Sequence, residues 1–335
     1  MTRDTTACRD TAKRMVAPGK GILAADESIG TMSSRLEKNG VEATEENRRA
    51  YRELLAATPD LSDGASGIIF CDETLNQSFA DGTPFPKAVH ALGILPGIKV
   101  DTGAKPCPGL PGEKVTEGLD GLADRLAEYA ENGAAFAKWR AVFTITDQTP
   151  SRGAIRANTN ALARYAAACQ EAGLVPIVEP EVLMDGDHAI DRCAEVTAMV
   201  HAALREELAL LNVDLAGIVL KPNMIIEGDD HEVHANAEQV AEATVTVLRD
   251  WPDELGGVTF LSGGQSPERA TANLEAIARQ DAPWPLTFSF GRALVDPALK
   301  AWHGEPDLVE AGQNALSDRV KANAAAVRGD LVTAE

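Results

Sequence analysis

The chain alternates short apolar runs with longer segments in which apolar residues recur at helical spacing. The apolar runs occupy residues 21–25, 67–71, 97–100, 136–142, 174–178, 215–220, 258–261 and 286–290. Each run is followed by polar or turn residues and then by a segment of helical periodicity, such as 160–172 or 235–249. Strand and helix units that repeat roughly every 40 residues predict an α/β fold, a (β/α)8 TIM barrel. A doubly wound open sheet is the weaker alternative.

One domain is expected to cover residues 1–335, because no Gly/Ser/Pro linker is long enough to divide the chain. We expect a helical extension of the barrel at about 303–335. The segment 101–117 is rich in proline and glycine, and we interpret it as a surface excursion between two strands.

Composition narrows the classes of partner. The 335 residues carry a formal net charge of −20, which argues against non-specific binding to nucleic acid or to anionic membranes. Any anionic ligand must therefore meet a local group of cations. The acidic excess suits a salty cytoplasm, and a general acidic bias explains it equally well.

The five cysteines are scattered without metal-ligand spacing, and no apolar segment resembles a signal peptide or a membrane span. We expect reduced thiols in a soluble, cytoplasmic protein.

The run that ends at Lys221 carries the strongest chemical signal. Small and apolar residues from Gly217 to Leu220 lead into a lysine, and Pro222 follows at once. This pattern predicts a buried parallel strand with an amine at its carboxyl end. A desolvated lysine is a nucleophile toward carbonyl groups, although a single strand-end lysine is more often one that extends into solvent.

Other charged residues fall at the ends of the predicted strands, where a barrel places its catalytic groups. Because side chains alternate along a strand, Lys138 and Arg140 share a face, and Glu179 and Glu181 share a face if Pro180 lets their strand continue. The charged positions on or directly after the first, third, fourth and fifth predicted strands are Asp26, Glu27, Lys99, Asp101, Lys138, Arg140, Glu179 and Glu181.

Two turns after the last predicted strands suit a phosphate group. Ser262, Gly263 and Gly264 expose backbone N–H groups ahead of a helix, and Gly291 precedes Arg292. Taken singly, these features also fit ordinary turns, helix caps or a salt-bridged rim. Together they favour a ligand site, because charges on several buried strands cost stability. The six histidines lack metal-ligand spacing, so we assign no metal and no cofactor.

Several motifs resemble one family, class I fructose-bisphosphate aldolase, in order and spacing over nearly the whole chain. They are GKGILAADES (19–28), TEENRRAYRELL (44–55), GIKVD (97–101), FAKWR (136–140), PIVEPE (176–181), LKPNM (220–224), GVTFLSGGQS (257–266), FGRAL (290–294) and LKAW (299–302). The resemblance implies a metal-independent lyase of glycolysis and gluconeogenesis. Its reaction is reversible cleavage of fructose 1,6-bisphosphate to dihydroxyacetone phosphate and glyceraldehyde 3-phosphate.

The resemblance also implies roles for individual residues. Lys221 matches the Schiff-base lysine, and Glu179 matches the general acid and base. Lys138 and Asp26 match residues that assist this centre, and Glu181 matches a carboxylate that holds the lysines. The implied substrate contacts are Lys99 and Arg140 near the sugar phosphate, Ser262, Gly263, Gly264, Ser289, Gly291 and Arg292 at the C1 phosphate, and Ser28, Thr31 and Arg35 near the other phosphate.

The chemistry requires such groups. Cleavage of a ketose leaves a carbanion that an iminium on Lys221 can absorb as an enamine. Repulsion from Lys138 would favour the neutral amine. Glu179 needs a pKa high enough to exchange protons near neutrality, and we expect this of a half-buried carboxylate beside Glu181.

The chain departs from the family pattern at three places. Phe290 stands where a tyrosine is often found, and Ser34 stands where related sequences carry a lysine, which weakens one phosphate contact. No tyrosine follows Tyr165, whereas animal members end in a tyrosine that assists protonation of the enamine. We therefore expect Glu179, water or another group to deliver that proton, and expect trimming of the last residues to leave turnover nearly unchanged.

Two other functions remain open at this point. One is a different Schiff-base lyase on the same barrel, such as a transaldolase-like enzyme, and the second is an inactive barrel that serves as a scaffold. The family is commonly tetrameric, so a homo-oligomer is expected.

Overall fold

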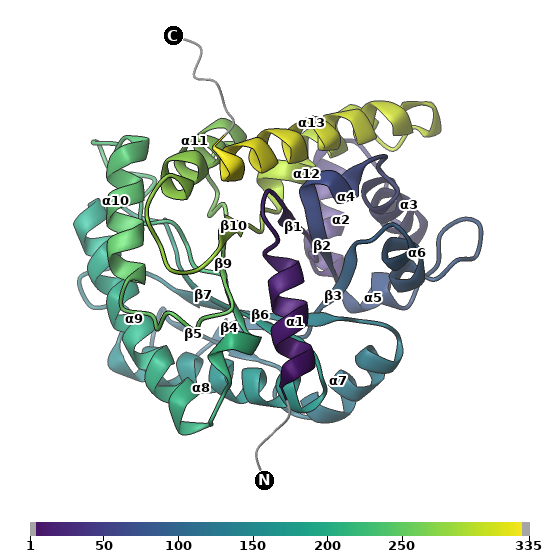
Figure 1. The fold of residues 1–335 in the computed structure, drawn as a ribbon. Helices are drawn as coiled ribbons and strands as arrows, with labels where there is room; N and C mark the ends of the chain where they lie inside the picture. The colour runs from purple at the N-terminus through teal and green to yellow at the C-terminus, as the bar shows by residue number, and fades with distance from the viewer. Residues whose placement is uncertain (1–4, 330–335) are drawn as a thin grey trace.

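A computed structural model describes residues 5–329 of the chain. Eight parallel strands form one sheet in the order β1-β2-β3-β6-β7-β8-β9-β10, and a hydrogen bond from Ala24 N to Phe290 O (3.0 Å) joins the two ends of the sheet. Figure 1 shows the strands as a ring with helices outside it. The predicted (β/α)8 barrel is confirmed. The strands of the barrel are β1 (Gly21–Ala25), β2 (Ala65–Phe70), β3 (Leu95–Lys99), β6 (Phe136–Phe143), β7 (Val175–Val182), β8 (Val219–Leu220), β9 (Val258–Phe260) and β10 (Leu286–Phe288).

The helices surround the ring and also cover one end of it. Two short 3-10 turns, η1 (Leu215–Gly217) and η2 (Pro306–Leu308), accompany them. The α-helices are α1 (Thr6–Met15), α2 (Ile29–Lys38), α3 (Glu45–Ala56), α4 (Leu61–Gly64), α5 (Asp72–Leu75), α6 (Phe85–Ala91), α7 (Leu122–Glu131), α8 (Arg152–Glu171), α9 (Ile190–Leu210), α10 (Ala237–Leu248), α11 (Pro267–Ala278), α12 (Arg292–Trp302) and α13 (Val309–Arg328).

The two helices expected from periodicity are present with shifted bounds. Helix α8 begins well before residue 160, because Ser151 caps it by accepting a hydrogen bond from Ala154 N at 3.2 Å. In α10 a capping box of Asn236 and Gln239 sets the first turn. Cap chemistry therefore decided where both helices start.

Two of the predicted strands differ from the observed ones by more than two residues at one end. Strand β7 continues through Pro180 to Val182, so the strand is longer than its apolar run. The run 215–220 shrinks to the pair Val219–Leu220, because residues 215–217 form a 3-10 turn. Proline at position 222 has no backbone N–H to continue the ladder beyond this short strand.

The segment 101–117 is not the simple surface excursion that we predicted. It contains a second, two-stranded antiparallel sheet of β4 (Gly103–Pro106) and β5 (Lys114–Glu117). Thr116 Oγ1 donates to Arg140 O (2.8 Å), and Asn158 Nδ2 donates to Lys114 O (2.9 Å). These bonds hold the hairpin against β6 and α8, beside the carboxyl ends of the strands.

The interior of the barrel is packed with side chains. Ile22, Ile69, Val175 and Val219 are among the buried residues of one apolar cluster, which also includes residues of α1. Helix α1 lies across the opening of the ring in Figure 1 and contacts β2 and β7. Because α1 covers this end with apolar side chains, we look for the ligand site at the other end, where the strands have their carboxyl ends.

Large and small residues alternate where the strands begin. A Cβ added to Gly97 would lie 2.2 Å from the ring of Phe136, and one added to Gly21 would lie 2.5 Å from Phe288. Glycine at the start of these apolar runs thus makes room for aromatic rings at the closed end of the barrel.

The C-terminal part packs on the outside of the barrel, where α13 contacts α11 and α12. The predicted extension at 303–335 includes this helix, and the chain end, with the expectation about trimming it, lies outside the described residues. Within residues 5–329, no helix is long and apolar enough to cross a lipid bilayer.

Candidate active site

A cavity of about 510 Å³ opens at the carboxyl ends of the strands. Every residue predicted to form the site lines it, except Gly264. The predicted residues in the lining are Asp26, Ser28, Thr31, Arg35, Lys99, Lys138, Arg140, Glu179, Glu181, Lys221, Ser262, Gly263, Ser289, Gly291 and Arg292. Gly264 is exposed in the turn next to the cavity.

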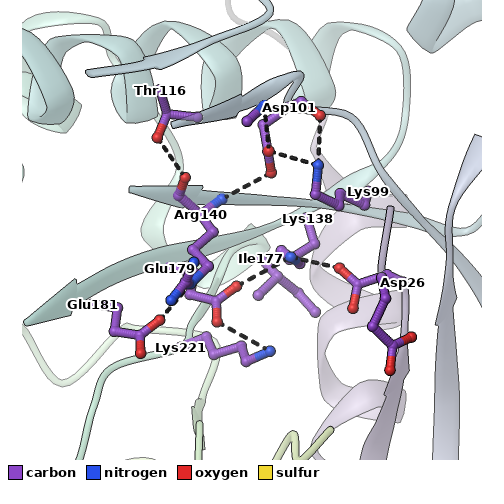
Figure 2. Close-up of polar contacts among 12 residues, drawn as sticks. Asp26, Lys99, Asp101, Thr116, Lys138, Arg140, Ile177, Glu179, Glu181 and Lys221 are labelled. Atoms are coloured by element: carbon purple, nitrogen blue, oxygen red, sulfur yellow. Dashed lines mark hydrogen bonds and ion pairs between the residues drawn. The ribbon is translucent and has the colours of Figure 1, made fainter. Parts of the chain in front are cut away.

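Four charged side chains meet at the floor of the cavity. Lys221 Nζ lies 3.3 Å from Glu179 Oε1, and Lys138 Nζ lies 3.4 Å from Glu179 Oε2. Lys138 Nζ also lies 2.5 Å from Asp26 Oδ2. All four residues are buried, with at most 9% of their surface exposed. Figure 2 shows Glu179 between the two lysine amines, with Asp26 on the far side of Lys138.

The register of β6 against β7 explains this convergence. Arg140 pairs with Glu179, and Lys138 pairs with Ile177 two positions earlier. Alternation along each strand then turns Lys138, Arg140, Glu179 and Glu181 toward the same face of the sheet. The sequence left open whether Pro180 lets this strand continue, and in the structure it does, since β7 runs to Val182.

The turns after β9 and β10 present unsatisfied donors to the cavity. Gly263 and Gly264 have φ angles of 57° and 84°, a backbone conformation that glycine adopts without strain. Ser289 Oγ is buried and makes no hydrogen bond within residues 5–329. Such a polar atom normally has a partner, so this hydroxyl is free to bind a ligand.

The side of the cavity formed by α2 is already paired with charges. Ser28 caps α2 by accepting from Thr31 N at 3.3 Å. Arg35 forms ion pairs with Glu27 and with Asp296. The positive charge of Arg35 is thus compensated by carboxylates.

Comparisons with known proteins identify the family. The family model described as "Fructose-bisphosphate aldolase class-I" matches residues 7–335. The chain is 53% identical over 323 residues to "Probable fructose-bisphosphate aldolase class 1" of Xanthomonas campestris pv. campestris, covering 96% of this chain and 97% of that protein. It is 51% identical over 324 residues to fructose-bisphosphate aldolase C of Rattus norvegicus, covering 96% and 89%. The chain belongs to the class-I fructose-bisphosphate aldolase family.

The fold comparison agrees. Fructose-bisphosphate aldolase from Plasmodium falciparum, solved in complex with TRAP and a small-molecule inhibitor, superimposes with a TM-score of 0.96. It is 44% identical in sequence, and the match covers 98% of this chain and 96% of that chain.

The electrostatics of this aldolase differ from our expectation for Glu179. Burial alone raises the pKa of Glu179, but Lys221, Lys138 and Arg140 outweigh burial and hold this pKa below its ordinary value. Burial likewise raises the pKa of Asp26, and the charges of Lys138 and Lys221 bring it to about 2. The predicted high pKa of Glu179 is therefore wrong for this arrangement, because the neighbouring positive charges act on it more strongly than burial does.

The partner of Glu181 also differs from the prediction that it holds the lysines. Glu181 forms an ion pair with Arg140. Burial lowers the pKa of Arg140, but Glu181 raises it above the ordinary value. Lys99 pairs instead with Asp101, whose Oδ1 lies 2.7 Å from Lys99 Nζ. Glu181 contacts Arg140 because the two residues lie on the neighbouring strands β7 and β6.

Sequence reasoning listed Asp101 among the strand-end charges but gave it no role at the site, and it did not include Lys105. Asp101 accepts hydrogen bonds from Arg140 N (3.2 Å) and Gly103 N (3.1 Å), so it fixes the start of the β4–β5 hairpin to β6. Lys105, on β4, also lines the cavity. Both residues fall in or next to the segment that we interpreted as a surface excursion, and only the turn residues there signalled a hairpin.

Within residues 5–329, no group of three or more His, Cys, Asp or Glu side chains could hold a metal ion.

Proposed function

We propose that this aldolase reversibly cleaves fructose 1,6-bisphosphate to dihydroxyacetone phosphate and glyceraldehyde 3-phosphate through a Schiff base on Lys221. The observation that carries the proposal is the amine of Lys221, 3% exposed at the floor of the cavity and 3.3 Å from Glu179 Oε1. An amine in this position meets a carbonyl away from bulk water, next to a group that exchanges protons.

The contact between Lys221 and Glu179 suggests how the cycle begins. A proton passes from the ammonium of Lys221 to Glu179, which leaves a neutral amine beside a carboxylic acid. The amine nitrogen attacks C2 of the ketose, and Glu179 gives its proton to the leaving hydroxyl, so that water departs and an iminium forms. Glu179 is then a carboxylate again, in the form that its lowered pKa favours.

The carboxylate next acts as a base. Glu179 takes the proton of the C4 hydroxyl, and the C3–C4 bond breaks. The aldehyde leaves, and the electron pair of the broken bond enters the iminium to form an enamine. Protonation at C3 and hydrolysis release dihydroxyacetone phosphate and restore Lys221. Lys138 supports these steps as a fixed positive charge, because Asp26 and Glu179 outweigh the effect of burial and hold its pKa above the ordinary value.

The remaining lining residues are assigned to substrate binding. The donors of Ser262, Gly263, Ser289, Gly291 and Arg292 suit one phosphate, because they combine free N–H and O–H groups with a guanidinium. Lys99 and Arg140 are assigned to the sugar, and Ser28, Thr31 and Arg35 are assigned to the other phosphate. Glu181 is proposed to orient Arg140.

Borohydride trapping tests the proposal. Reduction in the presence of dihydroxyacetone phosphate should add one three-carbon phosphate to Lys221, located by peptide mass spectrometry. Lys221→Met should abolish the adduct and lower turnover by at least about 10⁴-fold, the scale seen when a covalent nucleophile is lost. Lys114→Met, an exposed lysine outside the cavity, is the matched control and should retain both. Loss of activity in EDTA, or an adduct that survives Lys221→Met, would contradict the mechanism.

We further propose a cytoplasmic homo-oligomer without nucleic-acid or membrane partners. No disulfide joins the five cysteines within residues 5–329, which suits a reducing compartment. Leu210 and Val233 are 65% and 71% exposed, and apolar side chains of this kind are available for subunit contacts. The family resemblance favours a tetramer. Light scattering on the purified protein tests this, and a monomer at micromolar concentration would refute it.

The barrel and its C-terminal helix are proposed to form one domain. Helix α13 contacts both α11 and α12, so it is continuous with the outer layer. A single cooperative transition in urea, seen equally by fluorescence and circular dichroism, is the expected result.

A further inference from the structure

The cavity carries a surplus of positive charge in a protein of net charge −20. Its cations are Arg35, Lys99, Lys105, Lys138, Arg140, Lys221 and Arg292, and its carboxylates are Asp26, Glu27, Asp101, Glu179 and Glu181. The surplus is two charges. In an acidic protein, such a local excess is the feature that attracts an anionic substrate.

Ion pairs account for all of these carboxylates. Asp26 and Glu179 contact the two lysines on the floor, Glu181 contacts Arg140, Asp101 contacts Lys99, and Glu27 contacts Arg35. Among residues 5–329, Lys105 and Arg292 are the lining cations that have no such partner. The surplus therefore belongs to these two side chains, and both are exposed to solvent at the mouth.

The two unpaired cations enter the mouth from different sides. Lys105 lies on the hairpin that follows β3, and Arg292 begins α12 after β10. Strands β1 and β2 separate β3 from β10 around the ring. Arg292 follows the turn that carries Ser289, whereas Lys105 follows the end of β3 at Lys99.

The backbone of Lys105 is held firmly in this place. Lys105 pairs with Val115 in the hairpin, Thr102 N donates to Glu117 O at 2.9 Å, and Thr116 N donates to Asn158 Oδ1 at 3.1 Å. The side chain of Lys105 is exposed and forms no ion pair within residues 5–329. A lysine on a fixed backbone at a cavity rim can close on a phosphate without reordering the chain.

The arginine in the part of the mouth assigned to the second phosphate is already paired with carboxylates. Arg35 and Arg52 together are compensated by Glu27 and Asp296, and Ser34 contributes no charge. A phosphate dianion bound there would meet compensated charges unless Lys105 reaches it.

We propose that Lys105 binds the phosphate at the end of the sugar remote from Arg292, and thereby raises the preference for a bisphosphate over a ketose 1-phosphate. This inference rests on the proposed function, because it assigns a specificity contact to the same reaction. The Lys105 ammonium donates to phosphate oxygens and takes no part in bond cleavage.

Steady-state kinetics with two substrates test this role. Lys105→Ala should lower kcat/KM for fructose 1,6-bisphosphate about tenfold, the scale of one charge-assisted contact at a partly solvated site. The value for fructose 1-phosphate should change less than about twofold. Lys105→Arg should restore most of the preference, and Lys114→Ala removes the same charge from the same hairpin outside the cavity and should leave both values unchanged.

Salt dependence supplies a second readout that a purely structural role would not change. Raising ionic strength screens exposed charges, so the KM for the bisphosphate should rise less steeply in Lys105→Ala than in the wild type. Equal losses for both substrates, or an unchanged preference in an active Lys105→Ala enzyme, would overturn the inference and leave the Schiff-base reaction standing. A wild type that neither cleaves the bisphosphate nor forms the Lys221 adduct would overturn both.

Discussion

Two buried glutamates of this aldolase, Glu179 and Glu227, have similar exposure and different surroundings. Glu179 is 4% exposed and Glu227 is 1% exposed. Glu179 Oε2 makes no hydrogen bond within residues 5–329, and its contacts to Lys138 and Lys221 are 3.4 and 3.3 Å long. Glu179 lines the open cavity. It therefore retains capacity for a further partner.

Glu227 lies in the segment after β8, outside the cavity lining, and its oxygens are occupied. Oε1 contacts Arg269 and lies 2.8 Å from His234 Nδ1, and Oε2 accepts from Ala235 N at 3.2 Å. Burial alone raises the pKa of Glu227, but backbone N–H groups, His234 and Arg269 bring it to about 2. Burial and a lowered pKa are thus shared by both residues. Unfilled bonding capacity inside a cavity is what distinguishes the reactive carboxylate from the structural one.

The largest expected effect is on turnover. Glu179→Gln should lower kcat by about 10²- to 10⁴-fold, because it removes the proton acceptor and keeps the side-chain shape. Glu227→Gln makes the same chemical change outside the cavity and should keep kcat within about twofold. Assays at saturating fructose 1,6-bisphosphate measure both. Similar losses in the two variants would erase the distinction, and a pH–rate profile that is insensitive to Glu179→Gln would reject its acid–base role.

The second effect is on stability, and here the Glu227 variant should lose more than the Glu179 variant. Glu227→Gln should lower the free energy of unfolding by about 2 kcal/mol, because it weakens charged hydrogen bonds that are fully formed. Glu179→Gln should change it by less than about 1 kcal/mol, since the lost attraction to the lysines is offset by easier burial of a neutral group. Urea unfolding of both variants against the wild type gives the two numbers. A larger loss for Glu179→Gln would assign that residue a structural role.

The smallest effect is the pH dependence of the same difference. The folded pKa of Glu227 is about 2, below the value of about 4.3 for an unperturbed glutamate. A depressed folded pKa stabilises the protein fully above the unfolded pKa, and this contribution is lost as pH falls toward the folded pKa. The gap in urea midpoint between wild type and Glu227→Gln should therefore be constant from pH 7 to about 5 and should narrow below that. A gap that widens on acidification would contradict the assignment.

Much of the fold and site was predictable from the sequence. The apolar runs carry the strand pattern because each strand must bury its residues, and glycines at the start of runs mark places where rings such as Phe136 need room. The period-two alternation of Lys138 with Arg140, and of Glu179 with Glu181, depends only on local strand geometry. The family motifs then placed Lys221 and the phosphate turns in one cavity.

Only the tertiary structure decided which charges meet. Asp26 and Lys138 are far apart in the chain, and their contact depends on ring closure and strand register. The same register pairs Glu181 with Arg140 and places two lysine amines next to Glu179. The amines lower the pKa of Glu179, which the sequence alone had led us to expect above its ordinary value. The hairpin that carries Lys105 to the mouth is fixed by Asn158 and Asp101, residues outside its strands. Local patterns determine which face a side chain takes, whereas pairing, desolvation and free charge depend on distances between segments that only the folded chain brings together.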